Sequence, residues 1–280
     1  MTYSIVARDA ETGELGVAVQ SRAFRSGAGV PWAIPGVGAV ASQAFGERSY
    51  GPLGLELMRG GKSPEQALAA LLTTDPLAET RQVAMLAADG TAAVHTGTAC
   101  IAAAGHVIGD GVTAQANCVE SPRVWESMVE AFADAAGSLA LRLLAALDAA
   151  EAAGGDWRGR QAAGIYVVPA EGQPWETVCD LRTDDHPEPL VELRRLLQLH
   201  RGYSAIGETD DSATVARAAG MAEVDIRFAE IFDAARAHDL PRGRELIAEL
   251  AAEDKRWLGY LRALGDVDHL PHADELLREE

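Results

Sequence analysis

Cysteine is scarce in this sequence, and its few cysteines do not have the spacing of disulfide-rich domains or zinc sites. The 280 residues include three of them, Cys100, Cys118 and Cys179, which are widely separated and form no Cys-x-x-Cys pair. An odd number of separated cysteines makes a poor disulfide framework and a poor zinc site. We therefore expect all three to behave as small buried hydrophobic residues.

Positive charge is also scarce. The chain has 24 Lys and Arg against 42 Asp and Glu, a formal net charge of -18. Such a surface repels the phosphates of nucleic acids and of anionic membranes, so we expect neither as a partner. The sequence has no apolar run of about 18 residues to span a bilayer, and no basic segment followed by an apolar one at its start. These absences predict a cytoplasmic protein.

Common motifs of catalytic and cofactor-binding sites are missing as well. There is no Gly-x-Ser-x-Gly elbow, P-loop, His-Glu-x-x-His pair or glycine-rich dinucleotide-binding turn. The seven histidines are scattered, and none forms a group with metal-ligand spacing. Asp184-Asp185-His186-Pro187 is interpreted as a capped turn that leads into a helix. We expect no cofactor and no metal.

What the chain does have is a large supply of small apolar residues, since 48% of it is hydrophobic and only 5% aromatic. Alternating β-formers at residues 2–7 and 15–20, separated by a turn at 9–13, predict a hairpin that begins at the second residue. Further strands are predicted at residues 36–45, 82–87, 91–96, 105–109, 112–117, 161–168 and 176–181. Helices are predicted at residues 50–59, 64–72, 121–135, 138–153 and 190–200. Residues 25–35, rich in glycine and proline, are predicted to form a loop.

The order of these elements predicts their layering. Strands joined by short turns favour antiparallel sheets, and helices that come in pairs can cover the outer faces of two stacked sheets. Residues 1–203 are therefore predicted to form an α+β domain, a four-layer αββα sandwich. Residues 204–280 lack strand signals and predict an acidic helical tail. Its helix at 222–237 has an apolar face that needs a partner surface, either the main domain or a second copy in a homodimer.

The N-terminus is the best place to look for chemistry. Thr2 follows the initiator Met1, and threonine is small enough to allow removal of Met1. Removal leaves a hydroxyl and a free α-amine on one residue, and the amine, with a pKa of roughly 7.7–8.0, can accept the hydroxyl proton without a histidine. Many proteins begin with Met-Thr, so the pattern gains weight from the core strand that Thr2 starts. A retained Met1 would block this mechanism.

Six blocks between the N-terminus and about residue 200 carry a resemblance to a known family. They are MTYSIVARDAETGELGVAVQS, VPWAIPGVGAVASQAFGERSYGPLGLELM, HTGTAC, GDGVTAQANCV, GRQAAGIYVV and DLRTDDHPEPLVELRRLLQLH. They resemble the bacterial and archaeal DUF1028 family, a family of unknown function placed in the N-terminal-nucleophile (Ntn) hydrolase-like superfamily. The resemblance implies an Ntn-type αββα fold and a site beside the start of the first strand. It implies no substrate and does not extend to the tail.

Candidate residues around Thr2 come from strand ends and from polar positions in apolar strands. Ser4 shares a strand face with Thr2 and is expected to orient it. Asn117 ends a strand, and Ntn hydrolases commonly use an Asn side chain to stabilise an oxyanion. Arg22 is expected either to lower the pKa of the amine, to hold a substrate carboxylate, or to lie in a surface turn. The other supporting candidates, each also open to a structural role, are Ser21, Ser42, Gln43 and His95.

Three functions follow from the sequence. The first is an amidohydrolase that cleaves a small amide or peptide-like substrate with Thr2 as nucleophile. The second is a non-catalytic protein of the same fold that binds a small molecule or a partner. The third is a peptidoglycan-associated factor that uses the tail for targeting, against which the missing signal peptide counts. The first requires a free Thr2 amine in a cleft, and the second predicts a blocked or buried Thr2.

Overall fold

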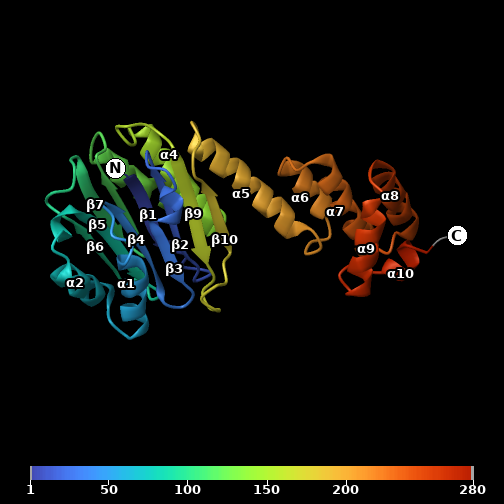
Figure 1. The fold of residues 1–280 in the computed structure, drawn as a ribbon, viewed down its shortest axis with the longest axis horizontal. Coiled ribbons are helices and arrows are strands. Elements are labelled where there is room, and N and C mark those ends of the chain that lie inside the picture. Colours follow the sequence, from blue (N-terminus) through green and yellow to red (C-terminus); the bar gives the residue numbers. More distant parts are fainter. Residues whose placement is uncertain (1, 279–280) are drawn as a thin grey trace. The chain divides into compact units, whose positions relative to one another are not determined.

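The computed structural model describes residues 2–278, so the question of Met1 lies outside the described residues. The chain divides into two compact units, one that ends at Arg194 and one that begins at Arg195. The strands and the first helices belong to the first unit (Figure 1). They are β1 (Thr2–Arg8), β2 (Leu15–Ser21), β3 (Pro31–Ile34), β4 (Gly38–Ala44), α1 (Tyr50–Arg59), α2 (Pro64–Thr74), β5 (Arg81–Ala87), β6 (Ala92–Thr96), β7 (Ala104–Gly109), β8 (Val112–Asn117), α3 (Arg123–Asp134), α4 (Leu139–Ala152), β9 (Ala162–Val168) and β10 (Cys179–Thr183).

The strands form two antiparallel sheets. The larger has the order β10-β9-β2-β1-β8-β7, and the smaller has the order β3-β4-β5-β6. In the larger sheet β1 pairs with β2 along one edge and with β8 along the other, with Thr2 opposite Asn117. The predicted α+β composition, the antiparallel sheets and the hairpin that begins at Thr2 are therefore confirmed. A strand bonded along both edges fixes the start of the chain in the sheet.

The two sheets pack face to face, with β1 and β2 against β4 and with β5 against β8. Helices α1 and α2 cover the outer face of the smaller sheet, and α3 and α4 cover that of the larger one (Figure 1). Small side chains fill the space between the sheets, where Ala39, Ala41 and Ala84 meet Val17 and Val19. A chain with few aromatic residues can fill such an interface at close sheet spacing.

The prediction of a loop at residues 25–35 was wrong for its last part, which contains β3. Pro31 begins this strand, which lies at the edge of the smaller sheet and pairs with β4. Proline has no N–H to donate to a sheet, and it is tolerated at the start of an edge strand for that reason. The same proline and the neighbouring glycines hid the strand in the sequence.

The outer face of the larger sheet buries two polar side chains in different ways. Tyr3 and Gln20 lie opposite each other on β1 and β2, and neither is exposed. The Tyr3 hydroxyl donates to a carboxylate oxygen of Glu151 in α4 at 2.6 Å, and burial raises the pKa of Tyr3 well above its ordinary value. The amide oxygen and nitrogen of Gln20 have no hydrogen-bond partner among the described residues. The side chain of Gln20 is thus a buried amide that forms no hydrogen bond with the described residues.

The second unit is helical. Helix α5 (Pro189–Ala205) continues through residues 194 and 195, and it is followed by α6 (Ser212–Ala218), α7 (Glu223–Arg236), α8 (Leu240–Glu253), α9 (Arg256–Asp266) and α10 (Ala273–Leu276). Ile231 and Phe232 of α7 pack with Leu246, Leu250 and Leu261 in one apolar cluster. The apolar face predicted for this helix is therefore buried within its own unit.

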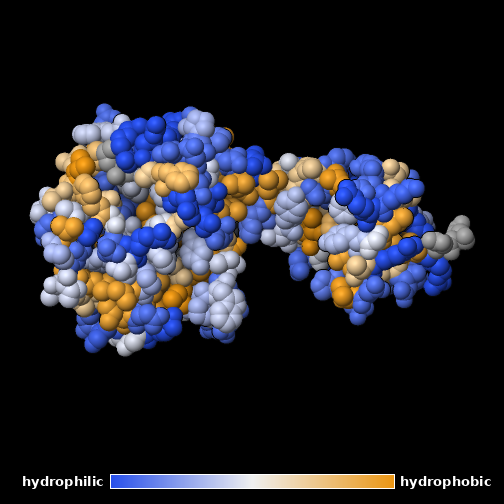
Figure 2. Space-filling view, in the orientation of Figure 1, coloured by the Kyte–Doolittle hydropathy of each residue, from blue (hydrophilic) through white to orange (hydrophobic). Residues whose placement is uncertain are grey.

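No helix in residues 2–278 combines the length and the apolar composition needed to cross a membrane. Hydrophobic residues are interspersed with hydrophilic ones on the face in view, including an apolar area over α1, where Leu53 is exposed (Figure 2).

Cys118 and Cys179 are buried as expected, whereas Cys100 is half-buried, and all three are free. Burial raises the pKa of Cys179 to about 12, so its thiol is not a nucleophile at neutral pH.

Candidate functional site

Thr2 and Ser21 meet at one end of the larger sheet. Because β1 and β2 are antiparallel, the first residue of β1 lies beside the last residue of β2. The Thr2 hydroxyl donates to the Ser21 hydroxyl oxygen at 3.0 Å, and the Thr2 side chain is almost completely buried. This contact fixes the direction of the Thr2 hydroxyl.

A cleft of about 420 Å³ opens beside Thr2. Its walls come from residues 23–30, which follow β2, and from residues 42–48, which end β4 and form the loop after it. Ser42 and Gln43, both selected from the sequence, line this cleft with Thr2. A cleft of this size accommodates a small molecule or a short peptide.

Arg25 and Arg48 also line the cleft, and neither was predicted from the sequence. Both are exposed. Arg25 Nε lies 3.7 Å from Asp184 Oδ2, and Arg48 Nη2 donates to the carbonyl of Ala28 at 3.0 Å. The Arg48 guanidinium also lies 5.8 Å from the ring centroid of Trp32. A guanidinium has five N–H donors, so each arginine can still bind a ligand carboxylate.

Behind Thr2, buried amide side chains connect the two sheets. The Ser4 hydroxyl donates to Gln43 Oε1 and accepts from Gln115 Nε2, both at 2.6 Å. Gln43 Nε2 donates to Gln82 Oε1 at 2.7 Å and lies 3.3 Å from the carbonyl oxygen of Thr2. Gln43 thus contacts both Ser4 and the backbone of Thr2.

Gln82 is the centre of this network, although it was not predicted from the sequence as a site residue. Its Oε1 accepts from Gln43 Nε2 and, at 2.9 Å, from Asn117 Nδ2. Its Nε2 donates to Thr96 Oγ1, to the carbonyl of Gly105 and to the carbonyl of Ala116. The available signal was a glutamine at the start of an otherwise apolar strand, because a buried amide needs partners on both its atoms.

Asn117 lies beside Thr2, but its amide group points into the network. Its Nδ2 donates to Gln82 Oε1 and lies 3.4 Å from the Thr2 carbonyl oxygen. Asn117 is buried and is not among the residues that line the cleft. An oxyanion role for Asn117 stays a prediction, and it requires rotation of this amide toward the cleft.

Arg22 and His95 do not line the cleft either. Arg22 is exposed, and its Nη1 lies 3.4 Å from the carbonyl oxygen of Arg160. The Nε2 atom of His95 lies 2.9 Å from the carbonyl oxygen of Ala78. These contacts are the ones expected if Arg22 lies in a surface turn and His95 has a structural role.

An ion pair holds the loop that follows β4. Arg81 Nε lies 2.7 Å from Asp75 Oδ2, and each side chain is only 10% exposed. Arg81 also donates to the carbonyl of Phe45, which lies between the cleft residues Ala44 and Gly46. The hydrogen bonds from Arg81 lower the pKa of the Asp75 carboxyl from 3.8 to about 2. The ionised carboxylate thus braces one wall of the cleft.

The part of the chain that holds this site resembles known proteins. Residues 2–193 match a family of unknown function, DUF1028. The crystal structure of a DUF1028 protein from Silicibacter pomeroyi has a TM-score of 0.65 and 33% sequence identity, and the match covers 70% of this chain and 84% of that chain. Anbu (ancestral beta-subunit) from Yersinia bercovieri has a TM-score of 0.34 and 13% identity, over 70% of this chain and 92% of that one. No curated protein matches the chain.

We expect Gln82→Met to lower the free energy of unfolding by about 3 kcal/mol, because buried donors on Gln43 and Asn117 lose their shared acceptor. Urea denaturation monitored by circular dichroism measures the change. The matched control is Gln20→Met, which removes a buried amide that has no partner among the described residues. The control is expected to leave stability unchanged or to raise it by about 1 kcal/mol. Equal losses in both variants would show that the network adds nothing specific.

Asp75→Asn is expected to flatten the dependence of stability on pH between about pH 4 and pH 2. The folded-state pKa of Asp75 is lowered to about 2, so its contribution is complete above the unfolded-state pKa and is lost as pH falls toward 2. The variant is expected to be less stable at pH 7, because Arg81 loses its charged partner. Urea midpoints across this pH range test this, with Asp110→Asn, at an exposed turn position, as control. Parallel curves for wild type and Asp75→Asn would contradict it.

Proposed function

The chain belongs to the DUF1028 family over residues 2–193, and from this premise we propose that it is an Ntn-type amidohydrolase that cleaves a small amide or peptide-like bond with Thr2. The observation that carries the proposal is the place of Thr2. Its hydroxyl lies at the start of a central strand, is held by Ser21 and borders a cleft of about 420 Å³. The two-sheet sandwich with helices on both outer faces is consistent with an Ntn-hydrolase-like fold.

The mechanism needs only the groups of one residue once Met1 has been removed. The α-amine of Thr2 accepts the proton of its own hydroxyl, and Oγ1 attacks the amide carbonyl carbon. The amine then gives this proton to the leaving nitrogen as the C–N bond breaks, which leaves an ester on Oγ1. Water, deprotonated by the same amine, hydrolyses the ester and restores Thr2.

The buried network serves this chemistry by positioning. Gln43 Nε2 and Asn117 Nδ2 lie 3.3 and 3.4 Å from the Thr2 carbonyl oxygen, so two buried amides hold the backbone of Thr2 while Ser21 holds its hydroxyl. A nucleophile held in one geometry loses little entropy when the substrate reacts. Ser4 and Gln115 support Gln43 in turn.

The lining of the cleft favours an amide that carries a carboxylate and an apolar group. Arg25 and Arg48 offer guanidinium donors, and Phe24, which is 64% exposed, offers an apolar surface in the same cleft. Arginine binds carboxylates through paired N–H donors, and the ring provides area for an acyl chain. N-acyl amino acids and short peptides have both features.

A non-catalytic binding protein is the alternative, and two observations favour it. Thr2 is almost completely buried, as this alternative predicts, although it borders the cleft. The amide nitrogen of Asn117 donates to Gln82 and lies close to the Thr2 carbonyl, so it does not offer the cleft an oxyanion donor in this conformation. The same cleft and arginines would then bind a carboxylate ligand without cleaving it.

Thr2→Ala is expected to lower kcat/KM for a panel of N-acyl amino acids and dipeptides by about 10³-fold or more, because the nucleophilic oxygen is lost. Thr2→Ser keeps that oxygen and is expected to stay within about tenfold of wild type. Intact mass must first show that each chain begins at residue 2. Mass spectrometry of the wild type quenched with substrate is expected to find the acyl group on Thr2. Hydrolysis by Thr2→Ala at the wild-type rate would overturn the proposal, and ligand binding without turnover by a processed chain would support the alternative.

Arg25→Ala and Arg48→Ala are each expected to raise KM for N-acyl amino acids about tenfold, the loss of roughly one charge-assisted hydrogen bond. The matching N-acyl amino acid amides lack the carboxylate, and their KM is expected to change little. Arg22→Ala is the control, since this arginine is exposed and does not line the cleft. Equal effects on charged and neutral substrates would contradict carboxylate recognition.

A further inference from the structure

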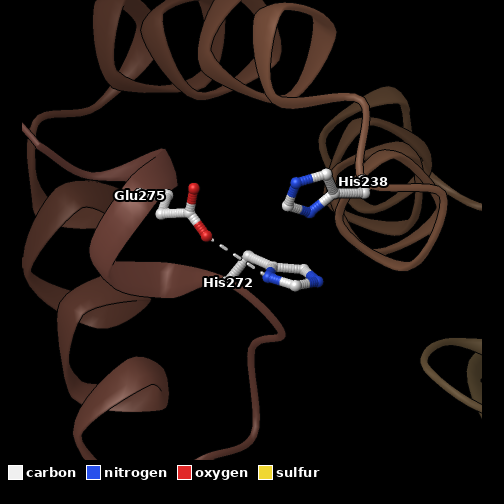
Figure 3. A group of neighbouring side chains, drawn as sticks. All are labelled: His238, His272 and Glu275. Carbon is white, nitrogen blue, oxygen red and sulfur yellow. Dashed lines mark ion pairs between the residues drawn. The ribbon is translucent and has the colours of Figure 1, made fainter.

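The unit that begins at Arg195 contains three side chains of metal-binding types close together, His238, His272 and Glu275 (Figure 3). His238 lies between α7 and α8, His272 precedes α10, and Glu275 lies in α10. One ligand atom from each residue lies within 4.8 Å of the others. His238 therefore lies close to a pair of residues from a distant part of the sequence.

The arrangement is close to that of a metal site. His272 Nδ1 lies 3.5 Å from Glu275 Oε1, and the rings of His238 and His272 have centroids 4.3 Å apart at an interplanar angle of 71°. Zinc bonds of about 2.0–2.2 Å in a tetrahedral site place ligand atoms roughly 3.4 Å apart. Both histidines are exposed and Glu275 is half-buried, so small side-chain rotations can close the remaining distance.

The backbone holds both histidines in turns of the chain. His238 has a φ of 55° and His272 a φ of 54°, a left-handed conformation that histidine adopts more readily than most residues. At His238 this conformation ends α7, because the Asp239 N–H donates to the Ala234 carbonyl and the His238 N–H donates to the Ala235 carbonyl. Both imidazoles are exposed.

We propose that His238, His272 and Glu275 bind one zinc-type divalent cation through two imidazole nitrogens and a carboxylate oxygen, with water at the remaining position. Imidazole and carboxylate are ligands that suit zinc, and two His with one Glu is a known zinc ligand set with an open position. The bound cation joins the α7–α8 turn to the segment that leads into α10. That segment already packs through Leu270, Ala273 and Leu276 in the apolar cluster of this unit. The cation is thus a cross-link for the last helix.

The test uses the full chain without a histidine tag, stripped of metal. Titration calorimetry with ZnCl₂ is expected to find one site per chain, and Co²⁺ is expected to give the visible absorption of a low-symmetry site. Saturating zinc is expected to raise Tm by about 5 °C or more.

His238→Gly and His272→Gly are expected to weaken zinc binding at least about tenfold each and to abolish the zinc-dependent rise in Tm. Glycine is unstrained at positive φ, so the metal-free variants are expected to keep or exceed the wild-type Tm, which separates loss of a ligand from loss of folding. Glu275→Gln is expected to weaken binding as well. The control is His269→Ala, an exposed histidine of the same unit outside the group, which is expected to bind zinc like the wild type.

Two results would overturn the proposal. One is the absence of zinc binding at micromolar to submillimolar concentrations. The other is zinc binding that persists unchanged in both glycine variants, which would place the metal elsewhere.

Discussion

Hydrogen bonding of the buried amides between the two sheets is the constraint on which the site depends. An amide side chain has a donor and an acceptor, and in a dry interface both need partners. Gln82 satisfies this requirement with both of its amide atoms. Its Oε1 accepts from Gln43 and Asn117, and its Nε2 lies within hydrogen-bond distance of three acceptors. A shift of one sheet against the other would break several of these bonds at once. The network therefore fixes the relation between the sheets, and with it the position of Thr2.

The sequence predicted much of this frame because hydrophobic alternation and turn residues are local signals. The hairpin from Thr2, the antiparallel sheets and the family were all predicted and are confirmed. Ser42 and Gln43 stood out as polar residues in a strand of small residues, and the structure brings them to the cleft with Thr2. The features of the fold and site that the sequence predicted involve residues whose neighbours are determined by strand pairing.

The rest depended on contacts that strand pairing does not determine. Arg25 and Arg48 reach the cleft from loops, and no pattern indicated their direction. Gln82 lies near the start of β5, next to Arg81, so its amide was not recognised as the link between Gln43 and Asn117. His238 and His272 are brought together by helix packing, and no spacing in the sequence reveals such a pair. The amide direction of Asn117 was decided by Gln82 and could not be read from Asn117 alone.

The central position of β1 also has a consequence for biosynthesis. β1 is made before its partner β8, so one of its edges stays unpaired until β8, which ends at Asn117, has left the ribosome. Its neighbour β2 waits longer, because its second partner is β9. The nascent chain therefore carries an unprotected hairpin rich in β-formers through much of translation, and exposed strand edges invite association between chains. The same pairing that holds Thr2 in the mature fold thus leaves the β1–β2 hairpin exposed during synthesis.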